Sequence, residues 1–223
     1  MGEVVGEILP LGLGVAISPI PVIAAILMLL SPRAKVTGVA FLVGWVAGIL
    51  VAVTVFTLLS SLLPEGDPDA SRPVQGVIKL ALGVLLIALA VKQWRARPDA
   101  GDEPELPKWM SAVDTFTPVK GLGFGFLLSA LNPKNLILAA GAGVAIGAGY
   151  LSTAETILAI AIFTVIAAAT VAIPVVAYLT AANRVAGPLE SLHTWLVRES
   201  STVMAVLLLV IGVVMLGKGI ESF

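Results

Sequence analysis

The sequence predicts an all-α membrane protein with six transmembrane helices, arranged as two inverted three-helix repeats in which helices 1 and 4 are broken at prolines. Three observations lead to this prediction. Of the 223 residues, 58% are hydrophobic and 12% are charged, whereas soluble domains carry roughly 25% charged residues. The apolar residues gather in runs that can cross a hydrocarbon layer of about 30 Å at about 1.5 Å per residue. The two halves of the chain also repeat a pattern of glycines and prolines.

Six apolar segments, separated by polar stretches, define the expected helices. The predicted spans are 8–31, 36–63, 74–96, 118–149, 152–181 and 200–220. They form a single transmembrane domain with repeat one at 1–96, a linker at 97–117 and repeat two at 118–223. Because six is an even number, both termini are expected on the same side of the membrane.

Lysine and arginine residues predict the orientation of these spans. One expected face carries most of them: Arg33, Lys35, Lys92, Arg95, Arg97, Lys108, Lys120, Arg184 and Arg198. The opposite face carries Arg72, Lys79 and Lys218. Because cytoplasmic loops are enriched in these residues, we expect the 97–117 loop in the cytoplasm and both termini outside it.

Spans 1 and 4 open alike, and a proline interrupts both. Each begins with Gly-Leu-Gly, at 12–14 and at 121–123. The interruptions are Ser18-Pro19-Ile20-Pro21 in span 1 and Asn132-Pro133-Lys134-Asn135 in span 4. A repeat of three spans is odd, so the second copy must be inverted relative to the first, as in many secondary transporters. Chance similarity between apolar runs is the alternative, and the matched proline breaks argue against it.

The two breaks are candidate binding sites because a proline inside a helix removes a backbone hydrogen bond. Lipid cannot satisfy the freed carbonyl and amide groups, so such breaks are tolerated where they face protein or a water-filled cavity. The ends of the half-helices then offer partial charges to a substrate. The alternative is simple kinking at Pro19, Pro21 and Pro133, repaired by neighbouring Ser or Asn side chains.

Lys134 is the one ionisable residue expected near the middle of the membrane. An isolated ammonium group is costly at that depth, so it must meet carbonyls, water or an anion, or be neutral. We interpret Lys134 as a contact for an anion; a lysine that snorkels from a re-entrant turn is the alternative. The amides of Asn132 and Asn135 suit a phosphate or carboxylate, but they equally suit mending of the broken backbone.

Two weaker patterns concern packing. In the connector before span 6, Pro188 favours the start of a helix with an apolar stripe, made of Leu189, Leu192, Trp195 and Leu196. Glycines four residues apart permit close helix packing within the chain or between the subunits of a homodimer; these pairs are Gly44/Gly48, Gly121/Gly125 and Gly143/Gly147.

Several functional classes lack the residues that they need. The chain has no cysteine, which excludes disulfide exchange, iron–sulfur ligation and thiolate metal sites. No cluster of buried His, Asp or Glu is apparent that could coordinate a metal. Nothing pairs a nucleophile with a base at usable spacing, so we expect no enzymatic activity. We also expect no cofactor and no nucleic-acid partner.

The sequence resembles a known family in both halves. The matching first-half residues are Ser18-Pro19-Ile20-Pro21, Leu29-Leu30-Ser31-Pro32-Arg33-Ala34, Gly38, Phe41 and Gly44-Trp45, and the second-half signature is Leu128-Ser129-Ala130-Leu131-Asn132-Pro133-Lys134-Asn135-Leu136. They are similar to the peptidoglycolipid-addressing (GAP, or Sap) family of the lysine-exporter (LysE) superfamily. The resemblance implies a bacterial inner-membrane transporter with relatives linked to moving glycolipids to the cell surface. It also implies a central site lined by Ser18, Pro19, Pro21, Asn132, Pro133, Lys134 and Asn135.

The expected function is therefore export or flipping of an anionic lipid or glycolipid. The headgroup would be held at the two breaks, and the acyl chains would stay toward the lipid. One alternative is an exporter of amino acids or other small solutes, and another is a non-transporting accessory subunit of a larger lipid-export complex. Expected partners are membrane lipids, an anionic lipid or small anionic substrate, and a second copy of the chain in a homodimer.

Overall fold

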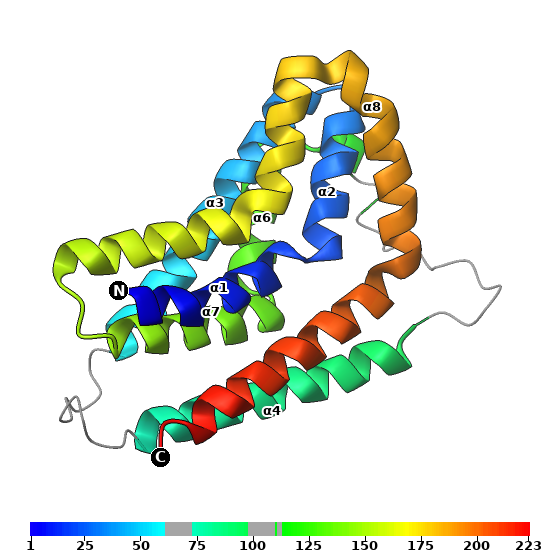
Figure 1. The fold of residues 1–223 in the computed structure, drawn as a ribbon. Coiled ribbons are helices and arrows are strands. Elements are labelled where there is room, and N and C mark those ends of the chain that lie inside the picture. Colours follow the sequence, from blue (N-terminus) through cyan, green and yellow to red (C-terminus); the bar gives the residue numbers. More distant parts are fainter. Residues whose placement is uncertain (61–72, 98–109, 111–112) are drawn as a thin grey trace.

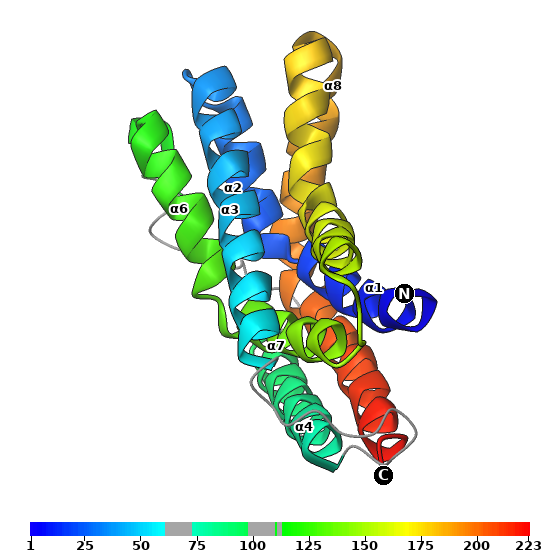
Figure 2. The ribbon, with the colours of Figure 1, turned by 90° about the vertical axis from the view of Figure 1, so that its left-hand side faces the viewer.

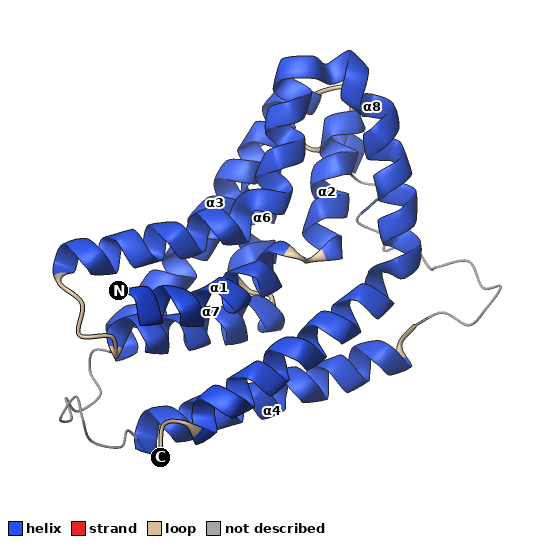
Figure 3. Cartoon of the chain, in the orientation of Figure 1, coloured by secondary structure: helices blue, strands red, loops and turns tan. Residues whose placement is uncertain are grey.

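The computed structural model describes residues 1–60, 73–97, 110 and 113–223, and its regular structure there is helical (Figures 1 and 3). In chain order, the elements are α1 (Gly2–Ala16), α2 (Pro19–Leu30), α3 (Ala34–Ser60), α4 (Pro73–Arg95), the 3₁₀ turn η1 (Val113–Thr115), α6 (Pro118–Ala130), α7 (Pro133–Gly147) and α8 (Thr153–Ile220). Most of the predicted linker at 97–117 lies outside the described residues.

The predicted interruptions of helices 1 and 4 are present. The chain bends by 52° between α1 and α2 and by 62° between α6 and α7. Three described helices, α3, α4 and α8, are long and apolar enough to cross a membrane, and the count rises to five if each bent pair is one span. These apolar helices identify a membrane protein.

The predicted spans 5 and 6 lie in two helices that meet at a kink, at the residue where predicted span 5 ends. Residues 153–220 form α8, which consists of two helices that meet at Ala181, where the backbone is non-helical (φ −148°, ψ 47°). Pro188 therefore lies inside α8 rather than at a helix start. The connector after Ala181 is helical. Its apolar stripe with a polar opposite face is the pattern of an amphipathic helix. Figure 1 shows α8 turning back at its top and descending to end alongside α4.

The packing of the helices crosses between the two halves. The second helix of the first half, α3, packs along the broken pair α6 and α7, while α8 packs along the broken pair α1 and α2. The last helices, α4 and the end of α8, pack together, and a Cβ on Gly83 would lie 3.0 Å from the carbonyl oxygen of Gly212. Figure 2 shows α3 beside α6 and α7. Each broken helix pair is therefore held by a helical element from the other half.

The predicted glycine pairs pack inside the chain. A Cβ on Gly48 would lie 2.8 Å from the carbonyl oxygen of Phe126, and one on Gly44 would collide with the backbone of Leu122. Gly143 lies equally close to the backbone of α3, with Thr57 N 2.7 Å from its would-be Cβ. Since these approaches occur within one chain, the glycine faces are covered without a second copy. A homodimer remains a prediction.

Candidate functional site at the two helix breaks

The first break frees carbonyl groups at the end of α1. Ile17 (φ −78°, ψ 68°) and the extended Ser18 separate α1 from Pro19, the first residue of α2. Pro19 has no N–H to donate to the carbonyl four residues earlier. The amide of Ser18 donates to the carbonyl oxygen of Ala16 at 2.7 Å instead of continuing the helix by bonding to Gly14. The C-terminal end of α1, where a helix carries partial negative charge, therefore needs other donors.

The second break is mended by two asparagine side chains. Asn132 caps α7, because its Oδ1 accepts a hydrogen bond from the backbone N of Lys134 at 3.0 Å. The Nδ2 of Asn135 reaches back to α6 and donates to the carbonyl oxygens of Leu128 at 3.3 Å and Ser129 at 3.5 Å. Those carbonyls lost their usual donors when Pro133 ended the helix. Both amides thus repair the backbone, although the buried Oδ1 of Asn135 has no hydrogen-bond partner within the described residues.

Lys134 joins the two breaks. Its Nζ donates a hydrogen bond of 2.7 Å to the carbonyl oxygen of Gly14, and the residue is 5% exposed. In the described part of the chain, its ammonium group is in no ion pair with a carboxylate. A cation in the first turn of α7 is disfavoured by the dipole of that helix, whereas the C-terminal end of α1 favours it. An ammonium group has three donors, and one of them is used here.

The seven residues expected at the site do not all line one cavity in this structure. Ser18 and Pro19 are buried and line an apolar cavity. Pro21 is buried in α2, while Asn132 is half-buried and Pro133 is exposed. Lys134 and Asn135 are buried at the start of α7. The structure thus ties Lys134 to α1 and places Ser18 and Pro19 at the cavity, and the shared lining of one central site stays a prediction.

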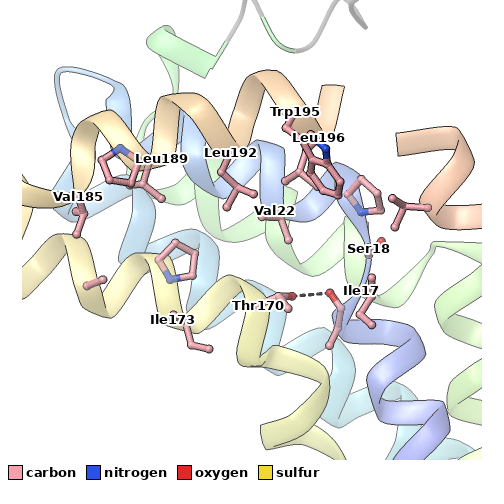
Figure 4. Close-up of a pocket in the computed structure, with 16 residues that line it drawn as sticks. Ile17, Ser18, Val22, Thr170, Ile173, Val185, Leu189, Leu192, Trp195 and Leu196 are labelled. Carbon is pink, nitrogen blue, oxygen red and sulfur yellow. Dashed lines mark hydrogen bonds between the residues drawn. The ribbon is translucent and has the colours of Figure 1, made fainter. Parts of the chain in front are cut away.

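The cavity beside the first break was not expected from the sequence. It has a volume of about 460 Å³ and lies between the α1–α2 break and the two arms of α8 (Figure 4). The first arm is the helix of α8 before Ala181, and the second arm is the helix after it. Thr170, in the first arm, donates a hydrogen bond to the carbonyl oxygen of Ala16 and so holds the end of α1. The apolar stripe of the sequence analysis faces this space from the second arm. Two features of the sequence could have indicated the cavity: the polar Thr170 within an apolar run, and the apolar stripe.

An ion pair between α1 and α4 was also not predicted from the sequence. Glu7 of α1 and Lys79 of α4 form an ion pair in which the Lys79 Nζ lies 3.0 Å from both carboxylate oxygens. Their side chains are 16% and 10% exposed, respectively. Glu7 and Lys79 line a small pocket together with Lys218 of α8. Lys134 is therefore not the only buried ionisable side chain, and this pair ties the start of α1 to α4.

Comparison with known proteins identifies one family that covers nearly the whole chain. Residues 8–221 match the family model described as "Sap, sulfolipid-1-addressing protein". No curated protein and no solved structure matches the chain.

Proposed function

Because the chain belongs to the Sap, sulfolipid-1-addressing protein family, we propose that it is a multi-pass transporter that exports or flips an anionic lipid or glycolipid. The family description names a lipid, which favours an amphiphile over a small solute. In this proposal the chain lies in the bacterial inner membrane with six spans, the 97–117 loop in the cytoplasm and both termini outside. It acts as a transporter of the LysE superfamily and not as an enzyme.

The observation that carries the proposal is the buried amine of Lys134, whose Nζ joins the two breaks by donating to the carbonyl of Gly14. A buried cation without a carboxylate partner is costly to keep in an apolar bundle. Among the residues that the structure describes, its one acceptor is a backbone carbonyl at the end of α1. An anionic headgroup would supply the counter-charge that the described protein groups do not, so the position selects for a negatively charged substrate.

The first turn of α7 would assist in binding such a headgroup. Helix N-termini attract anions because their amide groups point outward and the helix dipole is positive there. Lys134 follows directly on Pro133, the first residue of α7. We propose that the ammonium group exchanges the carbonyl of Gly14 for the headgroup during transport. Loss of that hydrogen bond would also free the end of α1 from α7 and leave it held by Thr170 of α8, which couples binding to a change in helix position.

The inverted-repeat arrangement is supported by the reciprocal packing of the two halves. The helical element that follows each broken pair packs against the broken pair of the other half: α3 on α6 and α7, and α8 on α1 and α2. A two-fold relation in the membrane plane produces this exchange. Transport would then proceed by rocking one broken pair with its partner helix against the other.

A test of the substrate class uses the purified protein in liposomes. Fluorescent phosphatidylglycerol is followed by chemical quenching of the outer leaflet, and a radiolabelled amino acid is followed in parallel vesicles. The proposal predicts faster redistribution of the lipid than in protein-free vesicles and no amino-acid flux. Amino-acid flux without lipid movement would support the small-solute exporter. No flux of either kind would support the accessory subunit.

A further inference from the structure

The apolar cavity is built from segments far apart in the sequence. One wall comes from Ile173 and Pro174 in the first arm of α8. The facing wall comes from Leu189, Leu192 and Trp195 in the second arm (Figure 4). Protein interiors are close-packed, with few voids larger than a water molecule. A volume of about 460 Å³ lies instead in the range of ligand sites, roughly 300–1,000 Å³. The space is therefore too large to be a packing defect.

One polar side chain in the lining has no partner. Ser18 is 1% exposed, and its Oγ makes no hydrogen bond within the described residues. Thr170, the other hydroxyl-bearing residue of the lining, already donates to the carbonyl of Ala16. A buried hydroxyl without a partner is costly. Ser18 thus holds an unused donor beside the cavity, and a rotation of its side chain would present that donor to an acceptor on a ligand.

We infer that this cavity seats one acyl chain of a lipid, and that the first polar oxygen next to the chain accepts a hydrogen bond from Ser18. The inference rests on the proposed function and deepens it. The occupant is an acyl chain because the lining is apolar and because Ile173, Leu192 and Trp195 are also exposed on the surface of the bundle. The solvent at that surface is lipid, so a chain can enter sideways.

The position of Ser18 connects the chain to the headgroup. Ser18 follows Gly14 by four residues, and Gly14 accepts the hydrogen bond from Lys134. A lipid with its chain between the two arms of α8 would therefore direct its polar end toward the α1–α2 break. This differs from the expectation that the acyl chains stay outside the protein, because one chain now lies within it.

Photo-crosslinking tests the inference. The probe is phosphatidylglycerol with a diazirine in the middle of one acyl chain, and the protein is the full chain in liposomes. After illumination, mass spectrometry of peptides locates the adducts. We expect adducts concentrated on the two arms of α8 around Ile173 and Leu192, in excess over exposed positions such as Val165. Even labelling of all exposed apolar residues would overturn the inference.

Two neighbouring substitutions separate the cavity from the surface. Ala177→Phe fills the cavity, because Ala177 lines it, whereas Val176 is exposed and does not. We expect Ala177→Phe to lower the adduct yield roughly tenfold, the change that about 1.4 kcal/mol of binding energy produces, and Val176→Phe to leave it unchanged. If Ala177→Phe does not fold, Leu192→Trp obstructs the cavity from the opposite arm. Equal yields in wild type and a folded filling variant would contradict the inference.

The same experiment shows which lipid supplies the acyl chain. It also separates failure of the cavity inference from failure of the proposed transport. The second probe is phosphatidylcholine with the same diazirine chain. If it labels the cavity as strongly as phosphatidylglycerol does, the occupant is a bulk lipid. If it labels the cavity more weakly, the occupant is the transported anionic lipid. Ser18→Ala should reduce the yield with either probe. Lipid movement without cavity adducts would refute only this inference, whereas cavity adducts without lipid movement would refute the proposed transport.

Discussion

The Nζ atom of Lys134 lies 2.7 Å from the carbonyl oxygen of Gly14, 120 residues earlier in the chain. The carbonyl belongs to the last turn of α1, and the lysine belongs to the first turn of α7. The two proline-interrupted helices are therefore fastened to each other at their breaks. This single contact satisfies a backbone acceptor released by one break with a donor presented by the other.

The cap of α7 predicts a local loss of stability. Asn132→Ala removes the acceptor for the backbone N of Lys134 and should lower the free energy of unfolding by about 1 kcal/mol, as other N-cap losses do. Asn132→Ser should retain most of the stability because serine caps helices well. Thermal unfolding of the purified protein in detergent, followed by circular dichroism, provides the comparison. An equal loss in both variants would argue that the side chain does not act as a cap.

The close approach of α3 and α6 predicts a contrast between two glycines of the same helix. A Cβ on Gly125 would collide with the backbone oxygen of Phe41 and lie 2.9 Å from the nitrogen of Trp45, whereas a Cβ on Gly123 would meet nothing within 4 Å. Gly125→Ala should therefore cost roughly 1–3 kcal/mol, as overpacking does. Gly123→Ala should leave the melting temperature unchanged or slightly raised, since alanine favours helix. Comparable melting temperatures for the two variants would refute this packing.

The Glu7–Lys79 ion pair predicts a non-additive double variant. Removing one partner leaves a charge buried without compensation, which costs about 3–5 kcal/mol, whereas replacing both partners together is tolerated much better. Glu7→Gln and Lys79→Met should each destabilise the protein more than the combined variant does. The measurement is a double-mutant cycle from denaturant-induced unfolding in mixed micelles. Strictly additive losses would show that the two side chains do not interact.

The helix breaks could be predicted from the sequence because the effect of proline is local. Pro19 and Pro133 each follow a residue with extended backbone, and each begins a new helix. The matched motifs in the two halves therefore located both breaks. The roles of Asn132 and Asn135 were left open between binding and backbone repair, and their hydrogen bonds favour repair.

The partners of the site residues could not be predicted for a physical reason. Lys134 donates to a backbone carbonyl, and every residue carries one, so no side chain marked Gly14 as the acceptor. The cavity depends on the turn at Ala181; hydropathy placed the end of a span there, but alanine is the strongest helix former and did not indicate how the chain turns back. The apolar stripe between predicted spans 5 and 6 indicated a helix there, but not that the stripe faces a cavity formed with the first helix of α8.

The most direct test of the account is lipid flipping by Lys134→Met in liposomes, with Lys120→Met as the matched control. Lys120 is exposed in the first turn of α6, at the opposite end of that helix from the second break. Both variants should insert and fold, because methionine keeps the shape of the lysine side chain. The account predicts that Lys134→Met abolishes movement of fluorescent phosphatidylglycerol while Lys120→Met flips it at the wild-type rate. Wild-type flipping by Lys134→Met would contradict the central role of the lysine between the two breaks.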